Sequence, residues 1–325
     1  MNRNGKWGIL GCSRVARNGF IPGILESKTG SLIAIASRQQ EQSQAWANEF
    51  KVPKSYGSYE ELLKDPDIDM VYIPLPNHLH HSWVIQAARS GKHILCDKPL
   101  AVNAVQAQEM VAVCKQYKVL LMEGFMWRFH PRTKKLMELV HQGVIGRLRV
   151  IRYIFSLTME SNDWRLNPAF GGGALRDIGC YGIDTARMIT GSMPQEVMAV
   201  RHMGSTGVDI TTSIQLEFPE NVMAQITCSF ELPFYYRIEL VGSEGMLRVS
   251  RKSLNGPPPE LFLHKGEEIG QIQIPEGNQF SHMIDHFTDC VLNKHSLIDP
   301  AENGLKNMTV IDQIEETASD ARGGS

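Results

Sequence analysis

The chain has 325 residues, 42% of them hydrophobic, and 33 Lys and Arg against 35 Asp and Glu give a net charge of −2. This length predicts two domains that each bury a core of their own. The near-neutral charge argues against a nucleic-acid or anionic-membrane partner, and no apolar run approaches the ~18 residues needed to span a bilayer. Residues 1–6 lack the apolar stretch of a signal peptide, so we expect a cytoplasmic protein.

The first 125 residues alternate between short apolar runs and segments with helical spacing. Strands are predicted at residues 6–10, 32–36, 70–73, 93–96 and 119–122. Helices are predicted at residues 15–25, 39–50, 59–63, 80–89 and 105–117. Short apolar strands that alternate with helices are typical of a doubly wound parallel sheet. We therefore predict an N-terminal α/β domain of the Rossmann type over residues 1–125.

The pattern changes in residues 126–325. Strands are predicted at residues 147–158, 196–202, 211–218, 222–230, 236–241 and 246–249. Helices are predicted at residues 133–142, 280–292 and 305–314, and another runs from the glycines at 171–173 to residue 189. Adjacent strands without intervening helices favour an antiparallel or mixed sheet. The second domain is therefore predicted to be α+β with a large, mostly antiparallel open sheet.

Six cysteines, at positions 12, 96, 114, 180, 228 and 290, are scattered with no C-x-x-C pair. Disulfide frameworks and structural zinc sites need closely spaced ligands, so the sequence predicts neither. The histidines at 78, 80 and 81 have no neighbouring cluster of acids or cysteines. We predict no metal.

A short turn between the first strand and the first helix has the G-x-G-x-x-[GA] spacing of a dinucleotide site, with Ser13 in place of the second glycine. Glycine permits the tight turn, a small middle residue lets the pyrophosphate approach, and the helix N-terminus binds the anion. An ordinary βα turn is the alternative. The predicted cofactor residues here are Gly11, Cys12, Ser13, Arg14, Val15 and Ala16.

The end of the second strand carries Ser37 and Arg38. An NAD-selective site usually has Asp or Glu there, ~20 residues after the glycines. A hydroxyl and a guanidinium suit a 2′-phosphate instead, which Arg attracts and a carboxylate would repel. We predict NADP(H) as the preferred cofactor and NAD(H) as the alternative, unless Arg38 is only a solvated charge.

Two further motifs resemble those of the Gfo/Idh/MocA family of oxidoreductases, which includes glucose–fructose oxidoreductase and inositol dehydrogenase. Cys96-Asp97-Lys98-Pro99 is similar to its E-K-P motif, and residues 177–184 are similar to D-x-G-x-[HY]-x-x-[DNH]. Residues 123–131 and 171–175 resemble the dihydrodiol and pentose dehydrogenase branch. The resemblance implies a dinucleotide-binding domain followed by a domain for substrate binding and oligomerisation, as a homodimer or homotetramer.

The resemblance implies that Lys98 and Tyr181 relay a proton and that Asp177 binds substrate. A lysine after a strand lies where open α/β sheets bind ligands, and its ammonium can donate to a developing alkoxide. Tyr181 is a second proton donor, and either residue could deliver the proton. Asp177 stands four residues before Tyr181, on the same face of a predicted helix. The alternatives are a solvated Lys98, a Tyr181 packed between domains, and an Asp177 that caps its helix.

The loop after the fourth strand holds Leu75, Pro76, Asn77 and His80. The resemblance places this loop against the ribose and nicotinamide of the cofactor, where Asn77 and His80 either bind the cofactor or stabilise the loop. For substrate binding the sequence offers Arg128, Trp164 and Arg165, because sugar sites combine aromatic faces with charged donors.

Together these features predict an NADP(H)-dependent oxidoreductase. It would interconvert a secondary alcohol or lactol and a carbonyl on a sugar or polyol-like substrate, with Lys98 and Tyr181 as the proton relay. One alternative is an enzyme that retains its cofactor for an internal redox cycle, such as epimerisation or glycosidic cleavage. Another is a non-catalytic dinucleotide or sugar sensor.

Overall fold

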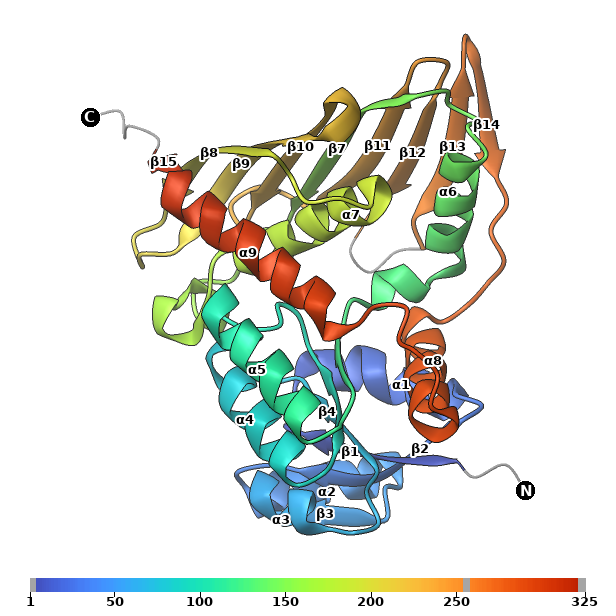
Figure 1. The fold of residues 1–325 in the computed structure, drawn as a ribbon. Helices are drawn as coiled ribbons and strands as arrows, with labels where there is room; N and C mark the ends of the chain where they lie inside the picture. Colours follow the sequence, from blue (N-terminus) through green and yellow to red (C-terminus); the bar gives the residue numbers. More distant parts are fainter. Residues whose placement is uncertain (1–3, 254–257, 321–325) are drawn as a thin grey trace. The chain divides into compact units, whose positions relative to one another are not determined.

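The computed structural model describes residues 4–253 and 258–320. The chain divides into two compact units (Figure 1). The first unit contains Met1–His130 and Glu276–Leu305, and the second contains Pro131–Pro275 and Lys306–Ser325. Among the described residues, no helix is long and apolar enough to cross a membrane.

Six strands of the described chain form the sheet of the first unit, and every pair is parallel. They are β1 (Gly5–Leu10), β2 (Gly30–Ala36), β3 (Lys54–Tyr56), β4 (Met70–Ile73), β5 (His93–Cys96) and β6 (Leu121–Glu123). Their order is β3-β2-β1-β4-β5-β6, so the strand order reverses between β1 and β4. This confirms the predicted doubly wound sheet and puts its switch point beside β1, where such sheets bind ligands.

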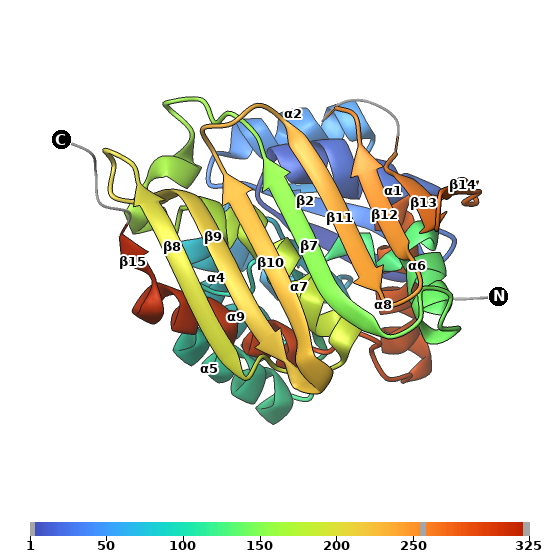
Figure 2. The ribbon, with the colours of Figure 1, turned by 90° about the horizontal axis from the view of Figure 1, so that it is seen from above.

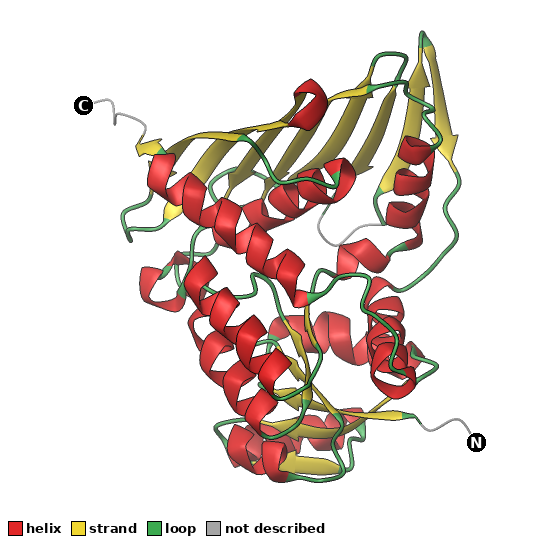
Figure 3. Ribbon diagram, in the orientation of Figure 1, coloured by secondary structure: helices red, strands yellow, loops and turns green. Residues whose placement is uncertain are grey.

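The helices of the first unit cover its sheet, as the red and yellow ribbons of Figure 3 show, and those within residues 21–116 connect consecutive strands. They are α1 (Ile21–Glu26), α2 (Gln40–Phe50), α3 (Tyr59–Lys64), α4 (Asn77–Arg89), α5 (Ala104–Gln116) and α8 (Gln279–Asn293). Aromatic rings fill the core between sheet and helices: Trp7 meets Phe20 edge-on at 5.4 Å between ring centroids, and Phe20 stacks on Tyr72 at 4.2 Å.

Helix α8 belongs to the first unit although it lies late in the chain. Its Met283 and Phe287 are fully buried in the core that contains Trp7. The Trp7 indole N–H donates to the Thr288 hydroxyl at 3.0 Å, and α8 packs closely enough on α1 that a Cβ on Gly23 would lie 2.5 Å from Phe280 Cβ. The compact units therefore differ from a single division at residue 125, because a segment of the C-terminal half completes the first core.

The second unit is built on a large sheet with the order β14-β13-β12-β11-β7-β10-β9-β8-β15 in the described residues. Its strands are β7 (Leu148–Ser156), β8 (Glu196–Met203), β9 (Asp209–Phe218), β10 (Val222–Ser229), β11 (Tyr235–Gly242), β12 (Met246–Arg251), β13 (Glu260–Lys265), β14 (Glu268–Ile272) and β15 (Ser319–Asp320). Only the pairs β7–β10 and β8–β15 are parallel among these strands. The predicted mostly antiparallel open sheet is confirmed, and Figure 2 shows its central strands side by side.

Helices α6 (Pro131–His141) and α7 (Cys180–Thr190) lie in the second unit, and α9 (Ala301–Thr317) begins in the first unit and ends in the second. Helix α7 packs directly on the sheet, because a Cβ on Gly182 would lie 2.6 Å from Ile226 Cγ2 and 2.7 Å from Tyr153 Cδ1. Contact this close fixes the start of α7, and with it Tyr181, against β7 and β10.

Candidate functional site

The turn after β1 is tight and leads directly into a capped helix. Gly11 has φ +112°, and a Cβ there would lie 2.7 Å from Leu75 Cδ2, so both backbone angle and space demand glycine. The Ser13 hydroxyl accepts a hydrogen bond from Ala16 N at 3.2 Å and thereby caps the helix. The helix begins at residue 14 and contains a π-helical turn, Ala16–Phe20. The residues present therefore fit a pyrophosphate at a helix N-terminus.

The side chains of this turn add no negative charge. Burial raises the pKa of the Cys12 thiol to about 11, against the opposing influence of Arg17, so the thiol is protonated at neutral pH. Arg14 is exposed at the first helical position and Val15 is half-buried. An anionic ligand would therefore meet a neutral or positive surface here.

Ser37 and Arg38, the two residues predicted to bind a 2′-phosphate, differ in their exposure to solvent. Ser37 is buried, and its hydroxyl donates to Gln42 Oε1 at 2.7 Å and accepts from Gln39 N at 3.3 Å. Arg38 is exposed and lies near Tyr59, where burial raises the pKa of the phenol and the Arg38 charge opposes that shift. The Tyr59 hydroxyl in turn lies 3.6 Å from the Cβ position of Gly11. Arg38 therefore lies beside the phosphate turn, whereas Ser37 mainly fixes the start of α2.

The loop after β4 brings Leu75, Pro76 and Asn77 to the same edge of the sheet, and His80 holds this loop to its neighbour. His80 is fully buried, with Nδ1 2.9 Å from the Pro99 carbonyl oxygen and Nε2 2.7 Å from that of Leu75. Burial lowers the pKa of His80 to about 4 although those carbonyls favour the proton, so a neutral ring donates to one of them. Both ring nitrogens face loop carbonyls, which favours the loop-stabilising role of His80 over direct contact with cofactor.

Lys98 follows β5 and lies near His80, where its charge helps to lower the pKa of that imidazole. The backbone just beyond it is anchored by Glu123, whose Oε1 accepts from Leu100 N at 2.7 Å. Glu123 is buried at the end of β6 and was not among the predicted site residues. The sequence feature that could have identified Glu123 is an acidic residue at the end of an apolar strand. Strands β1, β4 and β5 are neighbours in a parallel sheet, so the Gly11 turn, the Leu75 loop and Lys98 share one edge.

Arg128, a predicted substrate ligand, is held by an ion pair within the first unit. Its Nη1 lies 3.3 Å from Asp299 Oδ1, and the two side chains are 11% and 3% exposed. An ion pair this deeply buried is costly to break. The structure therefore brings Arg128 together with the segment after α8, whereas Trp164 and Arg165 lie in the other unit.

In the second unit, Arg165 joins two carboxylates. Its Nε lies 3.0 Å from Asp177 Oδ1, its Nη1 lies 3.2 Å from Asp163 Oδ1, and its guanidinium stacks on the Trp164 ring at 4.7 Å. Burial disfavours the charged guanidinium, but Asp177 and Asp163 outweigh it and raise the pKa of Arg165. Three of the predicted residues, Trp164, Arg165 and Asp177, therefore form one cluster.

Asp177 lies in a π-helical turn, Leu175–Gly179, that leads directly into α7. The sequence predicted an ordinary α-helix capped, in one interpretation, by Asp177. Asp209 caps this turn: its Oδ2 accepts a hydrogen bond from Leu175 N at 2.8 Å, and Asp177 pairs with Arg165. Single π-turns are common at functional sites. Tyr181 follows on α7, half-buried, with its ring centroid 6.4 Å from that of Phe155.

The glycines before this turn are required by close approach. A Cβ on Gly172 would lie 2.1 Å from the Arg165 carbonyl oxygen, and one on Gly173, where φ is +117°, would lie 2.1 Å from Asp209 Oδ1. Gly173 N donates to that same Arg165 oxygen at 2.9 Å. The glycines thus bind the Arg165 segment to the Asp177 turn. No group of three or more His, Cys, Asp or Glu in the described residues is placed to hold a metal ion.

Family models match most of the chain. Residues 5–125 match the model described as an oxidoreductase family with an NAD-binding Rossmann fold, and residues 133–248 match the GFO/IDH/MocA C-terminal domain.

Individual proteins match over nearly the full length. The chain is 38% identical over 318 residues to the D-xylose 1-dehydrogenase (NADP(+)) 2 of Haloferax volcanii, covering 96% of this chain and 97% of the relative. It is 36% identical over 321 residues to the trans-1,2-dihydrobenzene-1,2-diol dehydrogenase of Mus musculus, covering 92% and 93%. The crystal structure of an aldose-aldose oxidoreductase from Caulobacter crescentus is similar with a TM-score of 0.91 and 29% identity, covering 97% of both chains.

Proposed function

The chain belongs to the Gfo/Idh/MocA oxidoreductase family, as its motifs predict, and we propose that it is an NADP(H)-dependent dehydrogenase or ketoreductase of sugars or polyols. It interconverts a secondary alcohol or lactol and a carbonyl. The observation that carries the proposal is the shared edge of β1, β4 and β5, which presents the Gly11 turn and Lys98 together. The names of the two relatives specify a sugar, D-xylose, and a diol as substrates, which supports this class.

The first unit binds the dinucleotide in this proposal. The pyrophosphate lies on the Gly11–Ala16 turn and the 2′-phosphate meets Arg38, with the Leu75–Asn77 loop alongside. The cofactor, when bound, supplies or accepts the hydride. Arg38 favours NADP(H) because a guanidinium forms charge-assisted hydrogen bonds with phosphate. The NADP(+) in the name of the Haloferax volcanii relative agrees with this preference.

Lys98 and Tyr181 exchange the proton with the substrate oxygen, and Asp177 accepts hydrogen bonds from substrate hydroxyls. An ammonium and a phenol both donate to an oxygen that gains negative charge, and proton transfer of this kind contributes ~10²–10⁴-fold in rate. Trp164 and Arg165 shape the substrate side of the site. The second unit, with its large open sheet, also provides the surface for a homodimer or homotetramer.

The test is kinetic. Lys98→Met and Tyr181→Phe should each lower kcat by ~10²-fold or more while NADP⁺ still binds, as measured by cofactor fluorescence titration. Tyr235→Phe, at an exposed tyrosine on β11, is the matched control and should leave kcat unchanged. Near-normal kcat in both Lys98→Met and Tyr181→Phe would refute the proton relay.

A separate variant tests the cofactor. Arg38→Gln should raise KM for NADP⁺ by ~10-fold or more, since one charge-assisted phosphate contact is worth ~1.5–3 kcal/mol, and should change KM for NAD⁺ little. Arg89→Gln removes another exposed charge, at the end of α4, and serves as the control. Equal effects of Arg38→Gln on both cofactors would contradict the proposed NADP(H) preference.

The name of the Caulobacter crescentus protein, an aldose-aldose oxidoreductase, favours one alternative. In this second candidate function the enzyme retains its cofactor and passes the redox equivalents from one sugar to another. Net release of NADPH with a single sugar supports the dehydrogenase. Turnover that needs two sugars and leaves the bound cofactor unchanged in amount supports the alternative.

A further inference from the structure

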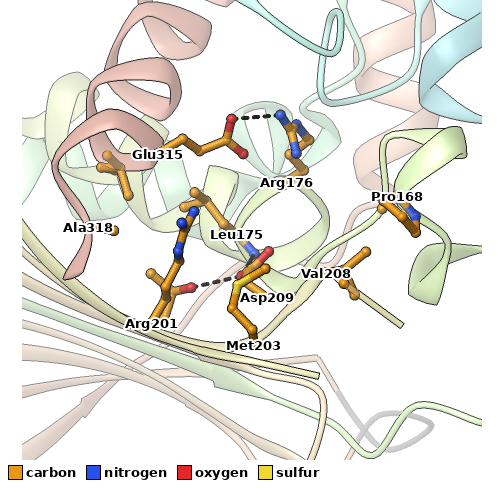
Figure 4. Close-up of a pocket in the computed structure, with 13 residues that line it drawn as sticks. Pro168, Leu175, Arg176, Arg201, Met203, Val208, Asp209, Glu315 and Ala318 are labelled. Atoms are coloured by element: carbon orange, nitrogen blue, oxygen red, sulfur yellow. Dashed lines mark hydrogen bonds and ion pairs between the residues drawn. The ribbon is translucent and has the colours of Figure 1, made fainter. Parts of the chain in front are cut away.

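The second unit contains a pocket of about 190 Å³ that the proposed reaction does not use. It lies between strands β8 and β9, the end of α9, and the π-turn that carries Asp177 (Figure 4). This volume is far above the ~10–15 Å³ that a cavity needs to hold one water molecule. A ligand of this size is a small metabolite and not a dinucleotide.

Two guanidinium groups reach this pocket from different elements. Arg176 comes from the π-turn, and its Nη2 lies 2.7 Å from Glu315 Oε2 on α9. Arg201 comes from β8, and Figure 4 shows its side chain rising from the strand into the same space. Two arginines that converge on one small volume are the residue set that binds carboxylate and phosphate oxygens.

The two acids of the pocket have different roles. Asp209 is engaged at the base of the pocket, where its Oδ2 accepts from both Leu175 N and Thr212 Oγ1 at 2.8 Å. Glu315 is the acid that pairs directly with Arg176, as the dashed line in Figure 4 shows. Burial raises the pKa of Glu315, and Asp209 and Asp312 raise it further, while Arg176 and Arg201 oppose them. Glu315 therefore gives up its negative charge more readily than an exposed glutamate does.

We propose that this pocket binds a small anionic metabolite, a carboxylate or a phosphate, between Arg176 and Arg201, and that Glu315 is the internal anion which the ligand displaces. The remaining wall is apolar, from Leu175, Met203 and Val208, so the ligand carries a short carbon skeleton beside its anionic group. All residues that line this site belong to the second unit, whereas the phosphate turn belongs to the first. It also contacts the turn that carries Asp177 through Arg176, the preceding residue.

Binding of two probes, inorganic phosphate and succinate, tests the proposal. Each is titrated by calorimetry into the full chain without cofactor, at constant ionic strength made up with KCl. All measurements use the Arg38→Gln background, which weakens anion binding at the first unit. We expect saturable binding of at least one probe, and the two titrations separate a phosphate from a carboxylate preference.

Two variants with opposite expected effects on the affinity for the probe test the roles of the individual residues. Arg201→Gln should weaken binding by ~10-fold or more, because a charge-assisted contact is lost. Glu315→Gln should strengthen it several-fold, because the internal competitor loses its charge. Arg149→Gln, at an exposed arginine on β7, should change nothing. Thermal unfolding in KCl alone checks that each variant is folded.

Three outcomes would overturn the proposal: no saturable binding of either probe, equal binding in the Arg201→Gln variant, or weaker binding in a folded Glu315→Gln variant. The last result would mean that Glu315 helps to hold the anion site together and does not compete for it.

Discussion

Replacing Asp209 by Asn separates the hydrogen bonds of this residue from its charge. The carboxylate accepts from Leu175 N and Thr212 Oγ1, both through Oδ2 and both at 2.8 Å. Asn retains one carbonyl oxygen, which can accept both hydrogen bonds in the same place. Asp209→Ala removes the acceptor altogether and leaves two buried donors without a partner. Comparison of the two variants therefore shows whether the π-turn needs an acceptor or an anion.

The structure predicts that the acceptor matters more. Burial is the largest influence on Asp209 and raises its pKa, although its hydrogen bonds and nearby arginines oppose the shift. Ionisation of Asp209 therefore destabilises the folded state at neutral pH. Asn carries no charge and avoids this destabilisation, although its hydrogen bonds are weaker than those of a carboxylate. We expect Asp209→Asn to stay within ~1 kcal/mol of the parent in free energy of unfolding. Asp209→Ala should lose about 2–6 kcal/mol, from ~1–3 kcal/mol for each unsatisfied donor.

Urea unfolding followed by tryptophan fluorescence measures these differences. The folded-state pKa of Asp209 lies above the unfolded value of ~3.9, so its favourable contribution is present below that pH and is lost as pH rises through the folded pKa. The stability of Asp209→Asn relative to the parent should therefore improve between pH 4.5 and pH 7. Thr212→Val removes one donor only and should cost ~1 kcal/mol. If Asp209→Asn is as unstable as Asp209→Ala at pH 7, the turn is held by the negative charge of Asp209 and not by its acceptor oxygen.

Three further predictions concern stability. Thr288→Val leaves the buried Trp7 indole N–H without its acceptor and should lower the free energy of unfolding by ~1–3 kcal/mol in urea; no change would show that α8 is not tied to the first core in this way. Gly172→Ala sets a Cβ 2.1 Å from the Arg165 carbonyl oxygen and should lower the free energy of unfolding by ~1–3 kcal/mol. An unchanged free energy of unfolding would contradict this close packing. The pKa of His80 is lowered from 6.5 to about 4 by burial, so its contribution is present above pH 6.5 and is lost as pH falls toward 4. His80→Gln should remove ~3 kcal/mol of this pH dependence, and an unchanged slope would refute the assignment.

The sequence predicted those elements whose residues show a strong apolar pattern. The predicted bounds of β4 and β5, residues 70–73 and 93–96, agree with the structure because continuous apolar runs mark buried parallel strands. Strands β13 and β14 were missed. Most of β14, Glu268–Ile272, is exposed, so solvent faces both sides and no alternation of apolar residues marks it. The two-residue strand β15 is too short to leave a pattern.

The candidate site shows the same limit more sharply. The tight turn at Gly11 could be predicted from the sequence, because a turn with this backbone geometry requires glycine. The partners of Arg128 and His80 could not, since Asp299 is far along the chain from Arg128 and the two carbonyls at His80 come from separate loops. Helix α8 was predicted as a helix, yet its amphipathic pattern does not say which core it joins. Local pattern specifies an element, whereas long-range packing decides its partners.

The ion pair between Asp177 and Arg165 in the second unit indicates which role Asp177 has in the proposed reaction. Asp177 lies 3.0 Å from the Arg165 guanidinium, and a cation at this distance favours the ionised carboxylate. An ionised carboxylate accepts hydrogen bonds from sugar hydroxyls but has no proton to donate. Within the proposed function, Asp177 therefore orients the substrate, and Lys98 and Tyr181 remain as the proton donors. Arg165→Met would remove the ion pair that holds the Asp177 carboxylate in place, so it should raise KM for the sugar more than it lowers kcat. A fall in kcat at unchanged KM would instead place Asp177 in the proton transfer.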